Sequence, residues 1–196
     1  MTVLQSYLRM LIFNLLLIST SYCKNPYTPK PLGYMMIDFP EKAYQVFDSI
    51  CPYTFEYPVY GMILPDDSRI AEKYWINIYF PQFDGTIHIS YKEVNNNLDE
   101  FIEDSRTLAY KHTIKADAIR EVVYTTKERN VYGLIYEIKG NAASSTQFYL
   151  TDSINHFLRG SLYFNVQPNV DSLAPVITFF REDIEHMIET FEWKNQ

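Results

Sequence analysis

The stretch WINIYFPQFDGTIHISYKEV, residues 75–94, decides the fold class of this chain. On either side of its middle, apolar residues alternate with polar or aromatic ones, as in a strand that buries one face and exposes the other. The Asp84–Gly85 pair between the halves is typical of a tight hairpin turn. The stretch therefore predicts two antiparallel strands joined by a turn, with one face of the pair against a hydrophobic core.

Further segments of strand length lie on both sides of this hairpin. Those that follow it are rich in β-branched and aromatic residues and are separated by short turns: 120–127, 131–140, 145–152 and 156–166. Short connections place consecutive strands side by side, so we expect an antiparallel meander. Before the hairpin, residues 34–39 and 58–65 are also predicted as strands, and the segment between them is compatible with a short helical turn before Pro52.

Two segments carry the periodicity of helices. In residues 96–113, apolar positions recur at helical spacing, and Asn97 with Glu100 three residues on has the form of a capping box. A second helix is predicted to open near Pro175, which fits its first turn, and its apolar stripe is expected to face the core. The predicted class is α+β: a single antiparallel sheet of about six or seven strands with packed helices. The element order resembles the PsbP/Mog1-type fold.

The N-terminus has the pattern of an export signal. In residues 1–22, Arg9 precedes a short apolar run, which a short polar stretch follows. Cys23 comes directly afterwards and opens a proline-rich tract, as in bacterial lipoproteins, whose cysteine thiol is lipidated and becomes the new N-terminus. We therefore expect 1–22 to be a signal peptide, 23–33 a stiff linker carrying acyl chains such as palmitate on Cys23, and 34–196 a single α+β domain.

An ordinary secretory signal is the alternative to a lipid anchor. Thr20 and Tyr22 stand where lipoprotein sites usually have an apolar and a small residue. In that case the chain would be cut nearby and Cys23 would be free. Cys51, the second of the 2 cysteines, is expected to be a buried small apolar residue rather than a reactive thiol.

Composition fits a folded domain and argues against nucleic-acid binding. The 196 residues are 47% hydrophobic and 21% charged, with a formal net charge of −7. Non-specific binding to nucleic acid needs a basic footprint, which an acidic chain without a Lys/Arg-rich run does not offer. The 17 Tyr and 13 Phe are best explained by packing in half-buried sheet positions. No apolar run reaches the roughly 18–20 residues that a membrane-spanning helix needs.

No pattern of catalytic or metal-binding residues stands out in the sequence. The 4 histidines are scattered without the spacing of a metal site, and no zinc-protease, nucleophile-elbow or phosphate-loop motif occurs. We therefore expect no catalytic residues, no metal site and no cofactor.

Two polar segments, AYKHTIKADAI (109–119) and KGNAASSTQFYLTDS (139–153), are candidates for an interaction surface. The proposed contact residues are Lys111, His112, Lys115, Asp117, Asn141, Ser144 and Ser145. Their polar residues are denser than a solvated loop needs, which favours contact with a partner protein. One alternative is ordinary capping and turn chemistry. Another is a hydrolase site built from His112, Asp117 and one of the two serines.

Several long stretches together resemble one family. They are GYMMIDFPEKAYQVFD, CPYTFEYP, INIYFPQFDGTIHISYK, NNLDEFIEDSRTLAYKHTIKADAI, VYGLIYEIKGNAASSTQFYLTDS, HFLRGSLYF and IETFEWK. On these stretches, from about Gly33 to Lys194, the chain is similar to the gliding-motility lipoprotein GldD family of Bacteroidetes. The resemblance implies a non-enzymatic part of the gliding machinery, held by lipid on the periplasmic side of a membrane. It also implies partners in that machinery and in the linked type IX secretion apparatus.

We therefore expect a lipid-anchored, periplasm-facing component of the cell envelope, with the outer membrane favoured over the inner one. Its expected role is to support assembly of the gliding machinery or of the type IX secretion apparatus. The alternative function is a periplasmic ligand-binding or chaperone-like domain. A deep apolar pocket with converging polar groups would favour that alternative.

Overall fold

The computed structural model describes residues 37–111, 116–166 and 170–194, together with Gln5, Tyr7 and Met10, and it omits the side chains of 170–172. The chain from Met36 to Gln196 forms one compact unit. It contains a seven-stranded sheet, a three-stranded sheet and two α-helices, α2 and α3, among the described residues. The predicted α+β class with a large antiparallel sheet is confirmed. The boundaries predicted for the signal peptide and linker lie outside the described residues and stay predictions.

The large sheet contains both predicted strand groups. Its order is β3-β4-β5-β9-β8-β7-β6, and every pair of neighbours is antiparallel. The strands are β3 (Met62–Pro65), β4 (Ile76–Phe80), β5 (Gly85–Glu93), β6 (Ala116–Thr126), β7 (Val131–Gly140), β8 (Ser144–Thr151) and β9 (His156–Phe164). The meander from β6 to β9 is confirmed, and β9 then pairs with β5 to join the meander to the first hairpin.

Two hairpins of this sheet turn in the same way. A short 3-10 helix, η1 (Pro81–Phe83) or η3 (Lys127–Arg129), follows the first strand of each. The next residue, Asp84 or Asn130, then adopts the left-handed conformation, with φ of 44° and 52° respectively. Aspartate and asparagine tolerate this conformation better than other residues with side chains. The predicted turn at Asp84–Gly85 is therefore confirmed.

The N-terminal part of the domain differs from the prediction. The small sheet consists of β1 (Tyr44–Phe47), β2 (Tyr53–Pro58) and β10 (Glu192–Trp193) in the order β1-β2-β10. The predicted helical turn before Pro52 is wrong, and so is the strand at residues 37–39, while 34–36 lie outside the described residues. The strand predicted at 58–65 is reduced to β3. Strand formation in such short segments depends on a partner, and here β10 from the far end of the chain supplies one.

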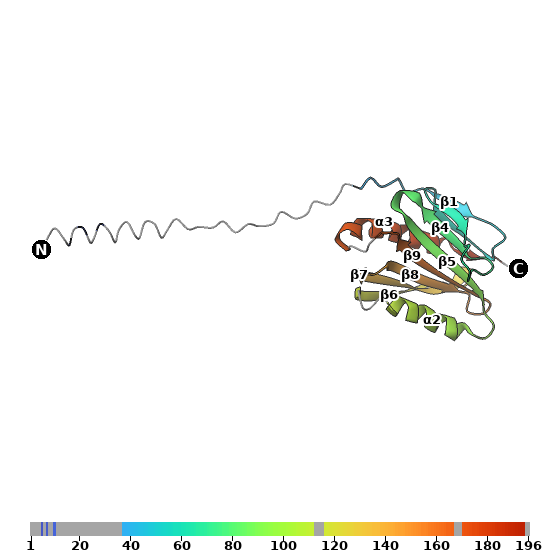
Figure 1. Cartoon of the computed structure of the whole chain (residues 1–196). Coiled ribbons are helices and arrows are strands. Elements are labelled where there is room, and N and C mark those ends of the chain that lie inside the picture. The colour runs from blue at the N-terminus through green and yellow to red at the C-terminus, as the bar shows by residue number, and fades with distance from the viewer. Residues whose placement is uncertain are drawn as a thin grey trace. The chain divides into compact units, whose positions relative to one another are not determined.

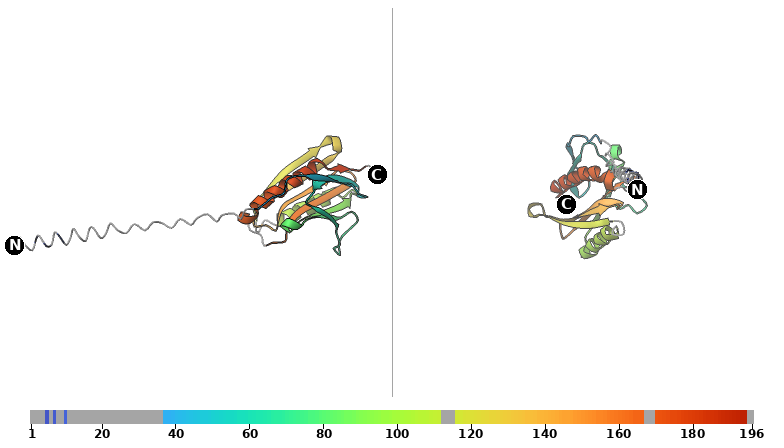
Figure 2. Two further views of the ribbon diagram at one scale, coloured as in Figure 1. Left: turned by 90° about the horizontal axis from the view of Figure 1, so that it is seen from above. Right: turned by 90° about the vertical axis from the view of Figure 1, so that its left-hand side faces the viewer.

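The helices α2 (Leu98–Tyr110) and α3 (Val170–Glu189) cover opposite faces of the large sheet (Figures 1 and 2). The predicted capping box is wrong, because Asn97 makes no side-chain cap and instead accepts the N–H of Asn95 at 2.8 Å. Since α3 begins at Val170, Pro175 lies in its second turn rather than its first.

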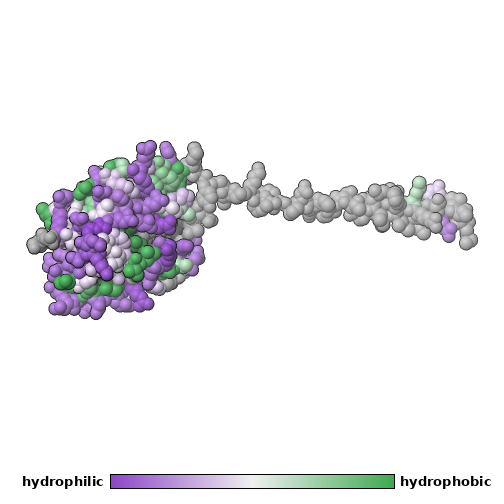
Figure 3. Space-filling model, turned by 180° about the vertical axis from the view of Figure 1, so that it is seen from behind, coloured by the Kyte–Doolittle hydropathy of each residue, from purple (hydrophilic) through white to green (hydrophobic). Residues whose placement is uncertain are grey.

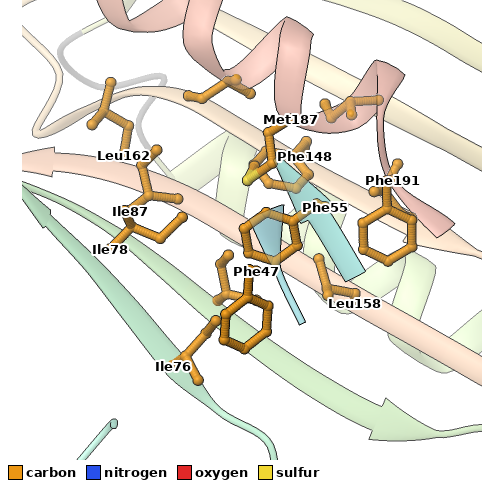
Figure 4. Packing of buried hydrophobic residues seen from close by; sticks show 14 of the residues in the cluster. Phe47, Phe55, Ile76, Ile78, Ile87, Phe148, Leu158, Leu162, Met187 and Phe191 are labelled. Atoms are coloured by element: carbon orange, nitrogen blue, oxygen red, sulfur yellow. The ribbon is translucent and has the colours of Figure 1, made fainter. Parts of the chain in front are cut away.

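The main core lies between the large sheet, the small sheet and α3 (Figure 4). Strand β5 shows the alternation that its sequence predicted, with Ile87 and Ile89 buried at 1% and 2% exposure. Met187 and Phe191, at the end of the chain, close the core from the side of α3 (Figure 4). Cys51 is a buried free thiol in this core, which confirms its predicted role as an apolar residue. The inner face of the central strands of the large sheet is therefore used for packing.

Asp152 closes the turn between β8 and β9. Its Oδ1 accepts the backbone N–H groups of Ile154, Asn155 and His156 at 3.0, 2.8 and 2.8 Å. Burial alone would raise the pKa of Asp152, but these three donors and the charge of His156 lower it below its ordinary value. The turn-forming role considered for this polar segment is what the structure shows for Asp152.

Replacing Asp152 with asparagine is expected to lower the free energy of unfolding by about 1–2 kcal/mol near neutral pH, because a neutral oxygen accepts these bonds less strongly. The folded-state pKa lies below the unfolded one. The carboxylate's contribution is therefore fully present above the unfolded pKa of about 4 and is lost as the pH falls through the folded-state value. Urea denaturation at several pH values checks this. The difference between the two proteins must shrink below about pH 4, and a constant difference would contradict the assignment.

Candidate functional site

The outer face of the large sheet is much more polar than the inner one. Across the central strands, Ser161 of β9 lies opposite His88 of β5 on one side and opposite Gln147 of β8 on the other. Arg159 lies two residues before Ser161 in β9 and therefore on the same face of the sheet. It lies opposite Ser90 of β5 on one side and Tyr149 of β8 on the other. Helix α2 packs mainly over β8 and β9, and its C-terminal end also contacts Tyr136 of β7. The part of the polar face formed by β4 and β5 borders a cleft beside the helix.

A cleft of about 610 Å³ lies where α2 leaves the sheet uncovered. The floor is formed by β4, β5 and β9, one wall by α2, and the other by the loop from Asp66 to Trp75. Its apolar side chains are Ile70, Trp75, Phe101, Leu108 and Phe157. The volume is that of a typical small-molecule site, and apolar walls with a few polar groups are the usual composition of such sites. We call this site the α2 cleft.

Arg159 is the cation on the floor of the α2 cleft. Its Nη2 donates to Oε1 of Gln147 at 2.6 Å, and none of the ion pairs among the described residues includes it. Burial lowers the pKa of Arg159, although the guanidinium stays charged at any physiological pH. Gln147 is only 1% exposed, and its Nε2 has no hydrogen-bond partner among the described residues.

His88 stands beside Arg159 on the same floor. Burial lowers the pKa of His88, the charge of Arg159 lowers it further, and Asp66 opposes both effects. The ring is therefore neutral at physiological pH, and its Nδ1 donates to Oδ1 of Asn77 at 2.7 Å. This leaves Nε2 of His88 as an acceptor.

The opening of the cleft is negatively charged, in contrast to the positively charged Arg159 on its floor. Asp67 and Asp104 are exposed lining residues, and Asp66 is half-buried. The second lining cation, Lys92, forms an ion pair with Glu72 and lies 5.5 Å above the Trp75 ring. The cleft thus combines one unpaired cation on its floor with carboxylates near its opening.

The interaction surface predicted from sequence lies at the end of α2. Ala116 at the start of β6 is paired with Gly140 at the end of β7, so the two polar segments come together. Asp117 is the extra residue of an irregularity between these strands, and it is exposed, as are Lys111 and Asn141. We call Lys111, Asp117 and Asn141 the turn surface. His112 and Lys115 lie outside the described residues.

The two serines of the predicted surface are buried in β8. Ser144 and Ser145 are 0% and 8% exposed, and Ser144 Oγ donates to the carbonyl oxygen of Thr146 at 3.3 Å. Ser145 is the extra residue of an irregularity in the pairing of β8 with β9, where Ser144 and Thr146 pair with successive residues of β9. The burial of both hydroxyls removes the accessible nucleophile that a hydrolase site would need, so the geometry does not support that alternative.

The surface shown in Figure 3 is largely hydrophilic, and its hydrophobic residues form small separate groups. Within the described residues, no helix is both long and apolar enough to cross a membrane. Likewise, no group of His, Cys, Asp or Glu side chains in the described part of the chain could hold a metal ion.

Sequence reasoning missed the α2 cleft. Its residues come from β4, β5, β9, α2 and one loop, so no local motif connects them. The available clue was Arg159, a charged residue in the middle of the otherwise apolar and aromatic strand HFLRGSLYF. His88 and Ser90, on the polar side of the first hairpin, were the second clue.

The comparison with known families settles the relationship of the chain. A family model described as gliding motility lipoprotein GldD matches residues 24–193. The chain belongs to the GldD family. Both the α2 cleft and the turn surface lie within the part that matches the GldD model. Family membership assigns the chain to gliding motility and to envelope lipoproteins.

The other comparisons say less about this GldD family member. The solution structure of cyanobacterial PsbP (CyanoP) from Synechocystis sp. PCC 6803 is 14% identical, with a TM-score of 0.49 over 84% of this chain and 99% of that chain. The overall likeness is limited, so the fold rests on the arrangement of strands and helices described above. Comparison with curated proteins gave no match.

Proposed function

We propose that this protein is a lipid-anchored, non-enzymatic component of the gliding machinery that faces the periplasm. Cys23 carries the lipid, and the outer membrane is favoured over the inner one. The role is to support assembly of the machinery or of the linked type IX secretion apparatus through protein contacts. The observation that carries the proposal is the family match, which begins at residue 24, directly after the proposed anchor.

The turn surface is the contact site we propose within this role. Lys111 and Asp117 are exposed groups of opposite charge near the end of α2, and Asn141 is exposed on the adjoining β7–β8 turn. Such a mixed polar patch favours a partner with complementary charges, because charged pairs at the edge of an interface set orientation and association rate. His112 and Lys115 remain proposed members of the same surface.

Deletion and complementation in the native host test the proposal. Deletion of the gene is expected to abolish colony spreading and impair type IX secretion, and the wild-type gene is expected to restore both. A gene carrying Lys111→Glu and Asp117→Lys should restore them poorly, although the protein accumulates normally. The matched control reverses an exposed ion pair on α3, with Arg181→Glu and Glu185→Lys, and should restore both fully. Normal spreading and secretion in the deletion strain would contradict the proposed role.

A further inference from the structure

We infer that the α2 cleft is a binding site for a small organic molecule that carries a single anionic group, of the carboxylate class, on an apolar body. This inference goes beyond the gliding role and does not depend on it. It rests on the shape of the cleft, the unpaired cation on its floor and the charge at its opening.

Arg159 supplies the anchor for the anionic group. Its one hydrogen bond to a described side chain, the 2.6 Å contact with Gln147, leaves guanidinium N–H groups for a ligand. A guanidinium binds a carboxylate through two parallel hydrogen bonds, which is the strongest neutral-pH pairing that this lining offers. A partly buried cation without a counter-ion is unfavourable in the empty cleft, and a bound anion removes that cost.

The apolar side chains that line the cleft would pack against the apolar body of the ligand. Trp75 and Phe101 come from the two walls and Phe157 from the floor, so an apolar group can be covered from three sides. Ile70 and Leu108 also line the cleft and are 75% and 38% exposed, so they add accessible apolar surface that a bound apolar group would cover.

The opening of the cleft limits the charge of the ligand. Asp66, Asp67 and Asp104 all line the cleft and would repel a polyanion such as a nucleotide. Lys92 does little to offset them, because it is already paired with Glu72. The hydroxyls of Ser90, Ser105 and Ser161 add neutral hydrogen-bonding groups, which suit one compact anionic group.

Two matched probes separate the contribution of the charge from that of the apolar body: indole-3-propionate and its neutral amide, indole-3-propanamide. Titration of the purified full-length protein by NMR is expected to move the amide signals of Ser90, Arg159 and Ser161. The propionate should bind about tenfold or more tightly than the amide, as expected for a charge-assisted pair. In Arg159→Gln this preference should vanish while the amide binds as before. Arg120→Gln, which removes an exposed arginine of β6, is the matched control and should change neither affinity.

Three results would overturn the inference. The first is equal binding of the two probes to the wild type, and the second is a preference for the propionate that survives in Arg159→Gln. The third is no shift of the cleft signals at about 10 mM probe, where even a site of about 1 mM affinity is nearly saturated. Should Arg159→Gln fail to fold, Leu108→Trp replaces it. That change partly fills the cleft from α2, so it must weaken both probes, and unchanged binding would place their site elsewhere.

Discussion

Replacing Asp183 with alanine is expected to lower the free energy of unfolding by about 3–5 kcal/mol, the usual cost of breaking a buried charge pair. Asp183 is only 1% exposed on the side of α3 that faces the first residues of the domain. Its Oδ1 accepts from Nζ of Lys42 at 2.6 Å and from Tyr44 at 3.1 Å, and its Oδ2 accepts from Tyr60 at 2.5 Å. Removal of the carboxylate leaves these three donors without their acceptor.

The groups around Asp183 are held in place and cannot readily find another acceptor when the carboxylate is removed. Burial, reinforced by Asp183, raises the pKa of both Tyr44 and Tyr60, so these phenols remain donors at any physiological pH. Lys42 also donates to the carbonyl oxygen of Phe179 at 2.7 Å and lies 3.4 Å from the centre of its ring, which holds the ammonium group in place. The cluster thus fastens the segment that precedes β1 to α3.

Urea denaturation of Asp183→Ala measures this effect, and the neighbouring residue provides the control. Glu182 lies 3.9 Å from the same Lys42 nitrogen but is 60% exposed, so Glu182→Ala should cost less than about 1 kcal/mol. A similar midpoint for the two variants would mean that the buried network contributes no more than a surface ion pair.

Replacing Gly160 with alanine is expected to lower the free energy of unfolding by about 3 kcal/mol, at the upper end of the usual effect of overpacking a core. A Cβ at this position would lie 2.0 Å from Cζ and 2.3 Å from Cε1 of Phe148. Phe148 stands opposite Gly160 on β8 and is 1% exposed, so its ring has no free space into which to move. The glycine is required here because the ring occupies the place of its side chain.

A double-mutant cycle tests that explanation. Phe148→Leu alone should destabilise the protein by removing part of the core, but it also makes room for a methyl group at position 160. The cost of Gly160→Ala, measured by urea denaturation, should therefore fall clearly in the Phe148→Leu background. An equal cost in both backgrounds would show that the clash with the Phe148 ring is not its cause.

Strong local patterns predicted much of the fold. The hairpin at 75–94 and the four-strand meander appear nearly where the sequence placed them, because alternation and turn residues act within a few positions of each other. The segment from Tyr44 to Pro58 could not be predicted in this way. Its strands form because β1 and β10 both pair with β2, and β10 lies more than a hundred residues away in the chain.

The candidate sites differ in the same way: local sequence predicted part of the turn surface, whereas the α2 cleft depends on the tertiary structure. The sequence placed Lys111, Asp117 and Asn141 on exposed turns, and the pairing of β6 with β7 brings their segments together. It could not show that Ser144 and Ser145 are buried, since that depends on where β8 begins. The α2 cleft was beyond local patterns altogether, because its floor and both walls come from separate parts of the chain.

The most direct test of the proposed function is the mass of the N-terminal peptide of the protein recovered from membranes of the native host, for the wild type and for Cys23→Ala. We expect a wild-type peptide that begins at Cys23 and carries acyl chains. The variant should lose that modification, leave the membrane fraction and fail to restore gliding. An unmodified wild-type N-terminus, or a Cys23→Ala variant that stays on the membrane and restores gliding, would contradict the lipid anchor on which the proposed role depends.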